Sequence, residues 1–206
     1  MKKMISVFAA LCAMLISGCT VTIPVTDGEK TEELEELGET DWEPGEVREY
    51  VVPAGVWSIA GLPIEEQVES AWEIDPDHYY FTRVIANEDD SVSFFMTEEQ
   101  YIRYLNKLNG EIEESIDTSE KRDRIEIEVS EDYREIKMLM GEEAGGYEFL
   151  MSFVRVATQV GAYQSFLGGE PEEWGLHIIV IKDGEILLDV NEPDESWTLT
   201  NEDFGE

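Results

Sequence analysis

Apolar and polar residues alternate along several short stretches of the chain, and turn-forming residues separate these stretches. The alternation predicts β-strands, since successive side chains of a strand point to opposite faces of a sheet. Alternation is clearest at 124–130, and elsewhere short runs of β-branched and aromatic residues between turn formers give the prediction. The predicted strands are 48–52, 56–60, 79–86, 91–96, 124–130, 133–140, 176–181 and 186–190. Asp183-Gly184 lies between the last two and favours a two-residue hairpin turn, in which both central residues have positive φ.

Two longer stretches have the helical period instead. Thr97 and Gln100 have the spacing of a capping box, and an apolar stripe recurs every three or four residues from Tyr101 to Ile116. Residues 147–167 are apolar nearly all round, which predicts the most buried element of the fold. In that helix Ala157 and Gly161 would let a neighbouring element approach closely. Residues 64–72 also fit a short helix.

Strand pairs punctuated by two main helices predict an α+β fold. We expect an antiparallel sheet built from hairpins, with the two principal helices packed on one face. The region 19–206 is long enough for one hydrophobic core and slightly short for two. Residues 47–206 are therefore predicted to form one α+β domain. Its predicted location is extracytoplasmic, because of the N-terminal sequence.

The first 18 residues have the three regions of a secretory signal peptide. Lys2 and Lys3 precede an apolar run from Met4 to Ile16, and the small residues Ser17 and Gly18 follow. The run is shorter than the roughly 20 apolar residues that a transmembrane helix needs, so a retained membrane anchor is the weaker alternative. We predict that residues 1–18 are a signal peptide that is removed.

Residues 16–19, Ile-Ser-Gly-Cys, resemble the lipobox of bacterial lipoprotein precursors. The resemblance implies that a diacylglyceryl group is attached to the thiol of Cys19 and that signal peptidase II cleaves before it. Two or more acyl chains give stable membrane attachment, whereas one gives only marginal attachment. The expected location is the extracytoplasmic face of a cell membrane, or the outer membrane of a diderm host. No cofactor is expected besides this covalent lipid.

Residues 19–46 are rich in glutamate, contain few large apolar side chains and end near Pro44-Gly45. Like charge and little apolar surface disfavour a packed structure. We interpret this stretch as an acidic flexible tether between the acylated cysteine and the domain.

The chain has 48 acidic and 14 basic residues, a formal net charge of −34. Nucleic-acid binding is disfavoured, because it relies on lysine and arginine neutralising phosphates. Cations, basic peptides or a basic wall polymer would be attracted. A solvated, self-repelling surface or an adaptation to high salt would give the same composition.

The sequence contains only two cysteines and two histidines, so few residues are available for thiol or imidazole chemistry. Cys12 and Cys19 are the only cysteines, so no disulfide is expected once the signal is removed and Cys19 is acylated. His78 reads as a turn residue and His177 as a packed or edge residue of a strand. No Gly-x-Ser-x-Gly elbow is present.

The remaining candidates are binding residues. Trp174 and Trp197 lie in a predicted loop and in the acidic tail, and we expect them to be exposed and able to contact a partner. Asp189, Asn191 and Asp194 are candidate oxygen ligands for Ca²⁺, although they lack the spacing of a twelve-residue calcium loop. Residues 53–59 weakly resemble the opening strand of small surface domains in Gram-positive lipoproteins.

These observations favour a membrane-anchored lipoprotein whose domain is a non-enzymatic binding or structural module of the envelope. Its partner would be an envelope protein or a glycan. The alternative is a carboxylate-dependent envelope hydrolase, with or without Ca²⁺. An enzyme should have a pocket in which acids with raised pKa values converge, and a binding module should have an exposed apolar patch or sheet edge. A third hypothesis is that the protein is a soluble subunit of a transport or secretion complex.

Overall fold

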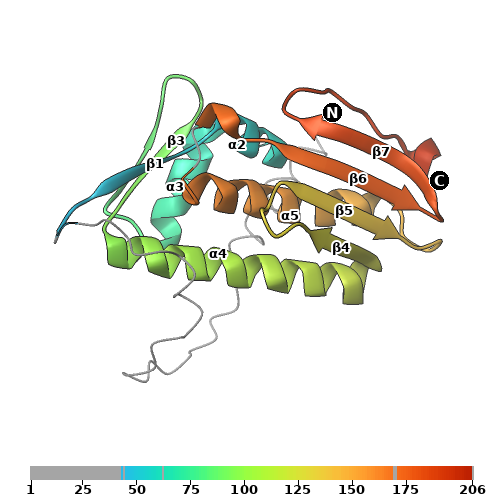
Figure 1. Cartoon of the computed structure of the whole chain (residues 1–206), viewed down its shortest axis with the longest axis horizontal. Coiled ribbons are helices and arrows are strands. Elements are labelled where there is room, and N and C mark those ends of the chain that lie inside the picture. Colours follow the sequence, from blue (N-terminus) through green and yellow to red (C-terminus); the bar gives the residue numbers. More distant parts are fainter. Residues whose placement is uncertain (1–42, 44, 62, 169–170, 206) are drawn as a thin grey trace. The chain divides into compact units, whose positions relative to one another are not determined.

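Two β-sheets and four α-helices make up the described part of the unit Val47–Glu206, as Figure 1 shows. The computed structural model describes residues 43, 45–61, 63–168 and 171–205. The predicted α+β class is confirmed. The signal segment 1–18, Cys12, Cys19, Trp42 and most of the predicted tether 19–46 lie outside the described residues.

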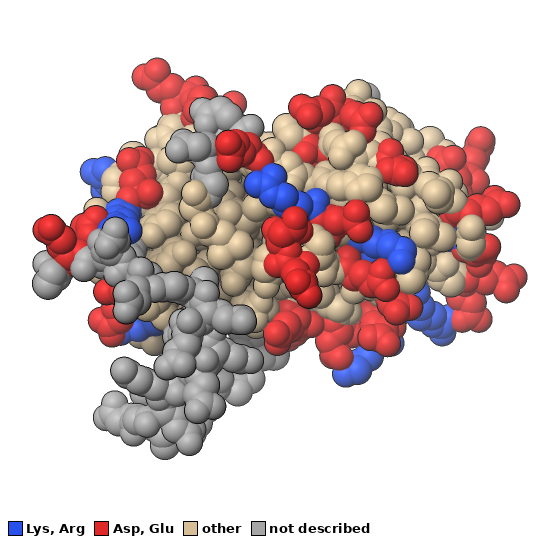
Figure 2. Space-filling model, in the orientation of Figure 1, with Lys and Arg blue, Asp and Glu red and all other residues tan. Residues whose placement is uncertain are grey.

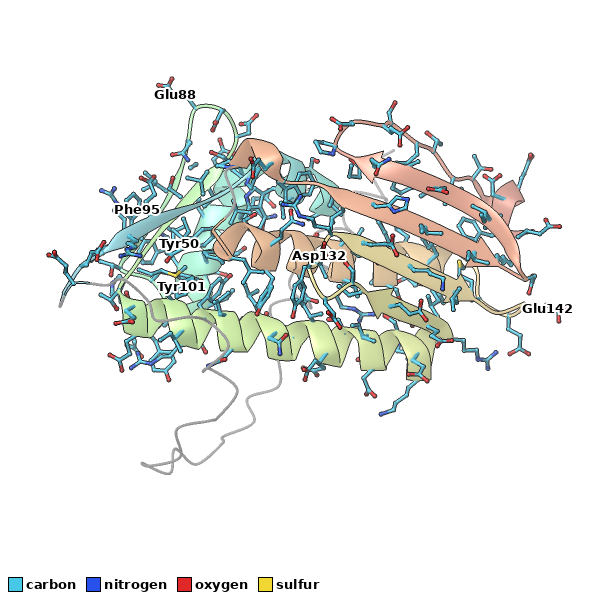
Figure 3. The ribbon with its side chains drawn as sticks, viewed as in Figure 1. Tyr50, Glu88, Phe95, Tyr101, Asp132 and Glu142 are labelled. Carbon is cyan, nitrogen blue, oxygen red and sulfur yellow. The ribbon has the colours of Figure 1, made fainter. Side chains whose placement is uncertain are left out.

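The smaller sheet has three antiparallel strands in the order β1-β3-β2. These strands are β1 (Arg48–Val52), β2 (Arg83–Ala86) and β3 (Val92–Met96). Residues 87–91 connect β2 to β3, and the sequence predicts a turn there at 87–90. In Figure 3 the Tyr50 side chain of β1 meets Tyr101, and the two rings stack with their centroids 4.8 Å apart.

The larger sheet has the strand order β4-β5-β6-β7. These strands are β4 (Ile125–Val129), β5 (Glu135–Met140), β6 (Leu176–Lys182) and β7 (Glu185–Glu192). The β4–β5 and β6–β7 pairs are antiparallel hairpins, and Asp183 and Gly184 have the positive φ values, 53° and 84°, that the second turn requires. The central β5–β6 pair is parallel.

The parallel pair follows from the helix between these two strands. Helix α5 (Gly146–Phe166) carries the chain from the end of β5 back to the start of β6. A crossover of this kind lets two strands run in the same direction, which a tight hairpin cannot do. The larger sheet is therefore built from two hairpins joined by a helical crossover, a detail that the hairpin pattern of the sequence did not predict.

The two principal helices are α4 (Glu98–Thr118) and α5, which pack against each other. Thr97 and Gln100 form the predicted capping box at the start of α4, with the Thr97 amide donating to Gln100 Oε1 over 2.9 Å. More than half of the 21 residues of α5 are buried. Helix α5 is therefore much more buried than α4, in which four residues are buried. The prediction that it is the most buried element holds for the number of buried residues but not for the buried fraction, because four of the five residues of β3 are buried.

The predicted strand 56–60 is wrong, because these residues belong to helix α2 (Ala54–Ala60). Pro53 precedes the helix in an extended conformation, and Gly61 ends it with a φ of 66°. The two buried positions, Val56 and Ala60, are four residues apart and fit a helical face as well as a strand. The segment 53–59, compared above with an opening strand, therefore lies mostly in a helix.

The predicted strand 79–86 begins only at Arg83. Before it, Asp75 follows helix α3 (Ile64–Ile74) and is almost fully buried. Its carboxylate accepts hydrogen bonds from the backbone amides of Tyr79, Tyr80 and Phe81. Amides that are bound by a side chain in this way are withdrawn from the sheet ladder.

Candidate functional site

The two faces of the larger sheet differ in what covers them. One face is buried against the core that contains α5, and its side chains include Ile125, Ile136, Met138, Ile178 and Val180. The opposite face points toward the viewer in Figure 1, where no described helix lies in front of it. We call this second surface the open face. In Figure 3 it lies between Asp132, in the β4–β5 turn, and Glu142, just after β5.

Strand register arranges the outward side chains of the open face in three rows. The rows are Glu135, His177 and Asn191; then Glu128, Lys137, Ile179 and Asp189; then Glu126, Leu139, Ile181 and Ile186. An irregularity in the β6–β7 ladder, after Val180, pairs Ile181 with Ile186. The open face therefore combines charged groups with an apolar strip.

The apolar strip consists of Leu139, Ile179, Ile181 and Ile186. The first three side chains are partly exposed, and Ile186 is 63% exposed. Single exposed apolar residues are common on protein surfaces, but here three of the four are register neighbours across three strands. The strip is thus a contiguous patch that a partner could remove from water.

Carboxylates border this strip and pair with the two basic groups of the open face. Lys137 Nζ lies 2.8 Å from Glu128 Oε2, and this hydrogen bond raises the pKa of the lysine. The His177 ring lies between two acids, with Nε2 2.8 Å from Asp189 Oδ1 and Nδ1 3.0 Å from Glu135 Oε2. Both ring nitrogens can donate only in the protonated imidazole.

The pKa of His177 is raised above its usual value, first by the hydrogen bond to Asp189 and then by the one to Glu135. The stabilisation that the charged ring provides is complete below the unfolded-state pKa of about 6.5, and it is lost as the pH rises through the higher folded-state pKa. We expect Asp189→Asn to lower the pKa of His177, as measured by NMR titration of the imidazole.

The control is Glu113→Gln, at an exposed position of α4, and it should leave the pKa of His177 unchanged. If His177 of the unaltered protein titrated at or below about 6.5, the arrangement of the two carboxylates around the ring would be refuted.

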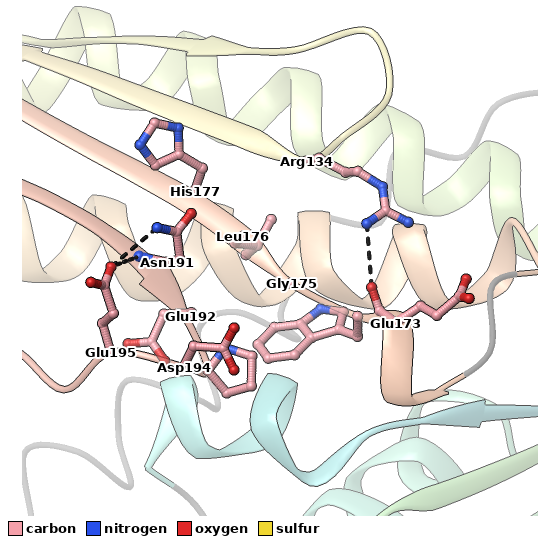
Figure 4. Close-up of a pocket in the computed structure, with 11 residues that line it drawn as sticks. Arg134, Glu173, Gly175, Leu176, His177, Asn191, Glu192, Asp194 and Glu195 are labelled. Carbon is pink, nitrogen blue, oxygen red and sulfur yellow. Dashed lines mark hydrogen bonds between the residues drawn. The ribbon is translucent and has the colours of Figure 1, made fainter.

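A pocket of about 640 Å³ adjoins the open face and shares His177 and Asn191 with it (Figure 4). Arg134 and residues 173–177 line one part of it, and residues 191–195 line the rest. Several of its polar groups already bond to each other. Arg134 Nη1 donates to the Glu173 carbonyl oxygen over 3.3 Å, and the backbone and side-chain amides of Asn191 donate to Glu195 Oε2.

The prediction that Trp174 is exposed is wrong, because only 8% of it is accessible. Its indole packs against a glycine of each of two helices. A Cβ built on Gly55 of α2 would lie 2.6 Å from Trp174 Cζ3, and one built on Gly161 of α5 would lie 3.0 Å from Trp174 Nε1. Gly161 therefore permits the close approach that its sequence position predicts. Trp174 lines the pocket from within the core.

Trp197 is half-buried rather than fully exposed. Its ring packs edge-on against Phe153 of α5, with centroids 5.3 Å apart. The indole nitrogen donates to Glu192 Oε1 over 2.6 Å. These contacts hold the C-terminal tail against the domain, and a binding role for Trp174 and Trp197 stays a prediction.

Gly55→Ala should lower the free energy of unfolding by about 1–2 kcal/mol, because the added methyl group overlaps the buried ring of Trp174. The matched control is Gly110→Ala in α4, where nothing lies within 4 Å of the new Cβ. This control should instead stabilise the protein by about 0.5–1 kcal/mol through helix propensity. Urea denaturation measures both, and equal effects would contradict the packing of Trp174 on α2.

The calcium candidates lie together near the end of β7, but each has its own surroundings. Asp189 bonds to His177, Asn191 bonds to Glu195, and Asp194 lines the pocket. Within residues 43, 45–61, 63–168 and 171–205, no three His, Cys, Asp or Glu side chains form a group that could hold a metal ion. Calcium binding at these residues stays a prediction.

Three carboxyl groups elsewhere have lowered pKa values. They are Asp89, Asp132 and Asp203, whose ionised forms are stabilised mainly by hydrogen bonds from Ser91, Ser130 and Thr200 respectively. A general acid would need the opposite shift. None of these three therefore resembles the raised-pKa acid expected of a hydrolase.

No protein-family model, no curated protein and no solved structure matches this chain. Among the helices that the structure describes, none has the length and apolar character needed to cross a membrane.

Proposed function

We propose that the chain is the precursor of a bacterial lipoprotein, and that its domain 47–206 binds an envelope protein or glycan outside the membrane. The location is supported by the signal-like segment 1–18 and by the lipobox-like residues that end in Cys19. The acidic stretch 19–46 would act as the spacer between the acylated cysteine and the domain.

The observation that carries the binding part of this proposal is the open face. A sheet face that no described helix covers, with a contiguous apolar strip between charged groups, has the features of an interaction surface. Binding would remove the strip, and Ile186 above all, from water.

The competing function is a carboxylate-dependent hydrolase, and the cluster of Glu135, His177 and Asp189 beside the pocket is the observation that favours it. A general base must hold a free lone pair within reach of the substrate proton. Both nitrogens of His177 already face a carboxylate, and this arrangement favours the protonated ring. The cluster therefore suits a charged structural link better than a base.

The experiment expresses the full precursor and its Cys19→Ser variant in a bacterium, followed by fractionation and protease treatment of intact spheroplasts. We expect the unaltered protein in the membrane fraction and accessible to the protease, because several acyl chains hold it there. The variant should lose stable membrane attachment. Identical fractionation of both proteins, or protection of the unaltered one from protease, would contradict the proposal.

A further inference from the structure

We infer that the open face binds an extended segment of a partner protein in which lysine or arginine side chains alternate with apolar ones on one side. This inference rests on the proposed binding function and names its surface and the chemistry of its partner. It follows from the charge, the spacing and the exposure of the three rows.

The charge of the open face is acidic after its internal pairs are counted. Its carboxylates are Glu126, Glu128, Glu135 and Asp189, and its basic groups are Lys137 and His177. Lys137 pairs with Glu128, and His177 lies between Glu135 and Asp189. Two basic groups therefore face four acids, and Figure 2 shows red carboxylate groups bordering the tan surface on the right. A cationic partner complements this excess.

The spacing of the rows fits an extended segment. Alternate residues of a strand lie about 7 Å apart on one side. Glu126 and Glu128 are separated in this way along β4, and Ile179 and Ile181 along β6. A partner segment that runs parallel to these strands presents its own alternate side chains at the same interval, so several cationic and apolar groups can contact the face together.

Other occupants of the open face fit less well. A second copy would bring the same acidic rows against each other in a chain whose formal net charge is −34, and like charges that face each other across strands are destabilising. The acidic stretch 19–46 of this chain has the same disadvantage. A surface of anionic lipid headgroups would also be repelled.

The experiment measures binding of a fluorescent peptide, Lys-Thr-Val-Thr repeated three times, to the full-length acylated protein in neutral detergent. Such a peptide presents Lys and Val alternately on one side when extended. We expect saturable binding that weakens with added salt. A peptide with Glu in place of Lys should not bind, and equal binding of both peptides would overturn the inference.

Matched variants locate the binding surface. The double change Glu126→Gln with Glu128→Gln should weaken binding about tenfold, while Glu113→Gln with Glu114→Gln, an equal change of charge on exposed α4, should change it less than about twofold. Similarly, Ile186→Ser should weaken binding more than Tyr147→Ser. Tyr147 is the matched control, because it is 59% exposed but belongs to α5 and not to the open face. Circular dichroism of each variant shows whether the fold is retained.

Each remaining outcome decides against the inference. Equal losses in the face and control variants would mean that overall charge attracts the peptide, and no binding at all would reject a cationic partner segment. Dimers in sedimentation velocity that Ile186→Ser dissociates would assign the open face to a second copy. None of these results bears on the Cys19→Ser fractionation, so failure of this inference is distinguishable from failure of the proposed lipoprotein function.

Discussion

Replacing Arg155 with methionine is expected to lower the free energy of unfolding by about 3 kcal/mol, because it leaves the largely buried carboxylate of Asp123 with only the exposed and more distant Arg122 as a counter-charge. Arg155 Nη2 lies 3.2 Å from Asp123 Oδ2, and the two side chains are only 17% and 11% exposed. Ser152 Oγ donates to the same carboxylate oxygen over 3.1 Å. This network joins α5 to the π-helical turn Ser119–Asp123 that follows α4.

The control for this change is Arg122→Met, which removes the same chemical group near the same acid. Arg122 is 79% exposed and its Nε lies 3.7 Å from Asp123 Oδ1, so the expected loss is below about 1 kcal/mol. Adding Asp123→Asn to Arg155→Met should recover part of the lost stability, since no unpaired charge remains buried. Urea denaturation measures all four proteins, and similar losses for Arg155→Met and Arg122→Met would contradict the role of burial.

The second large effect is expected at Asp75, where Asp75→Ala should lower the free energy of unfolding by about 3 kcal/mol. The carboxylate of Asp75 is the acceptor for three consecutive backbone amides, at 2.6 Å from Tyr79 N and 2.8 Å from both Tyr80 N and Phe81 N. Asp75 is 2% exposed, as is Phe81. Removal of the acceptor leaves these amides without their partner and loosens the connection between α3 and β2.

Hydrogen exchange tests the cause of this loss directly. In Asp75→Ala the amides of residues 79–81 should exchange much faster, while those of α5 change only with global stability. Asp77→Ala, in the exposed part of the same turn, should cost less than about 0.5 kcal/mol. Unchanged protection of residues 79–81 in Asp75→Ala would show that the carboxylate does not hold this segment.

Local signals in the sequence were sufficient for many of the elements. The Thr97 capping box and the Asp183-Gly184 turn depend on residues within a few positions, and the structure contains both. The prediction for 56–60 failed because Val, Trp and Ile favour strands intrinsically, whereas Pro53, Gly61 and the packing of Val56 near Gly161 favour a helix. A seven-residue helix is too short for its period to be distinguished reliably from a strand.

The candidate site was harder to predict because its contacts join distant parts of the chain. His177 meets Glu135 across 42 positions, and it does so only because β5 and β6 are parallel in one specific register. Likewise, the burial of Trp174 depends on glycines of two separate helices. The alternation that defines the outward residues of β4 was visible in the sequence, but β6 contains the unbroken apolar run 178–181, and the order of the strands was not visible.

The central claim is that this acidic domain is held at a membrane through a lipid on Cys19. The most direct test extracts the protein from its native membranes and determines the mass of its N-terminal peptide by mass spectrometry. The account predicts a peptide that begins at Cys19, lacks residues 1–18 and carries the mass of a thioether-linked diacylglyceryl group. A peptide that retains residues 1–18, or one with an unmodified Cys19 thiol, would contradict it.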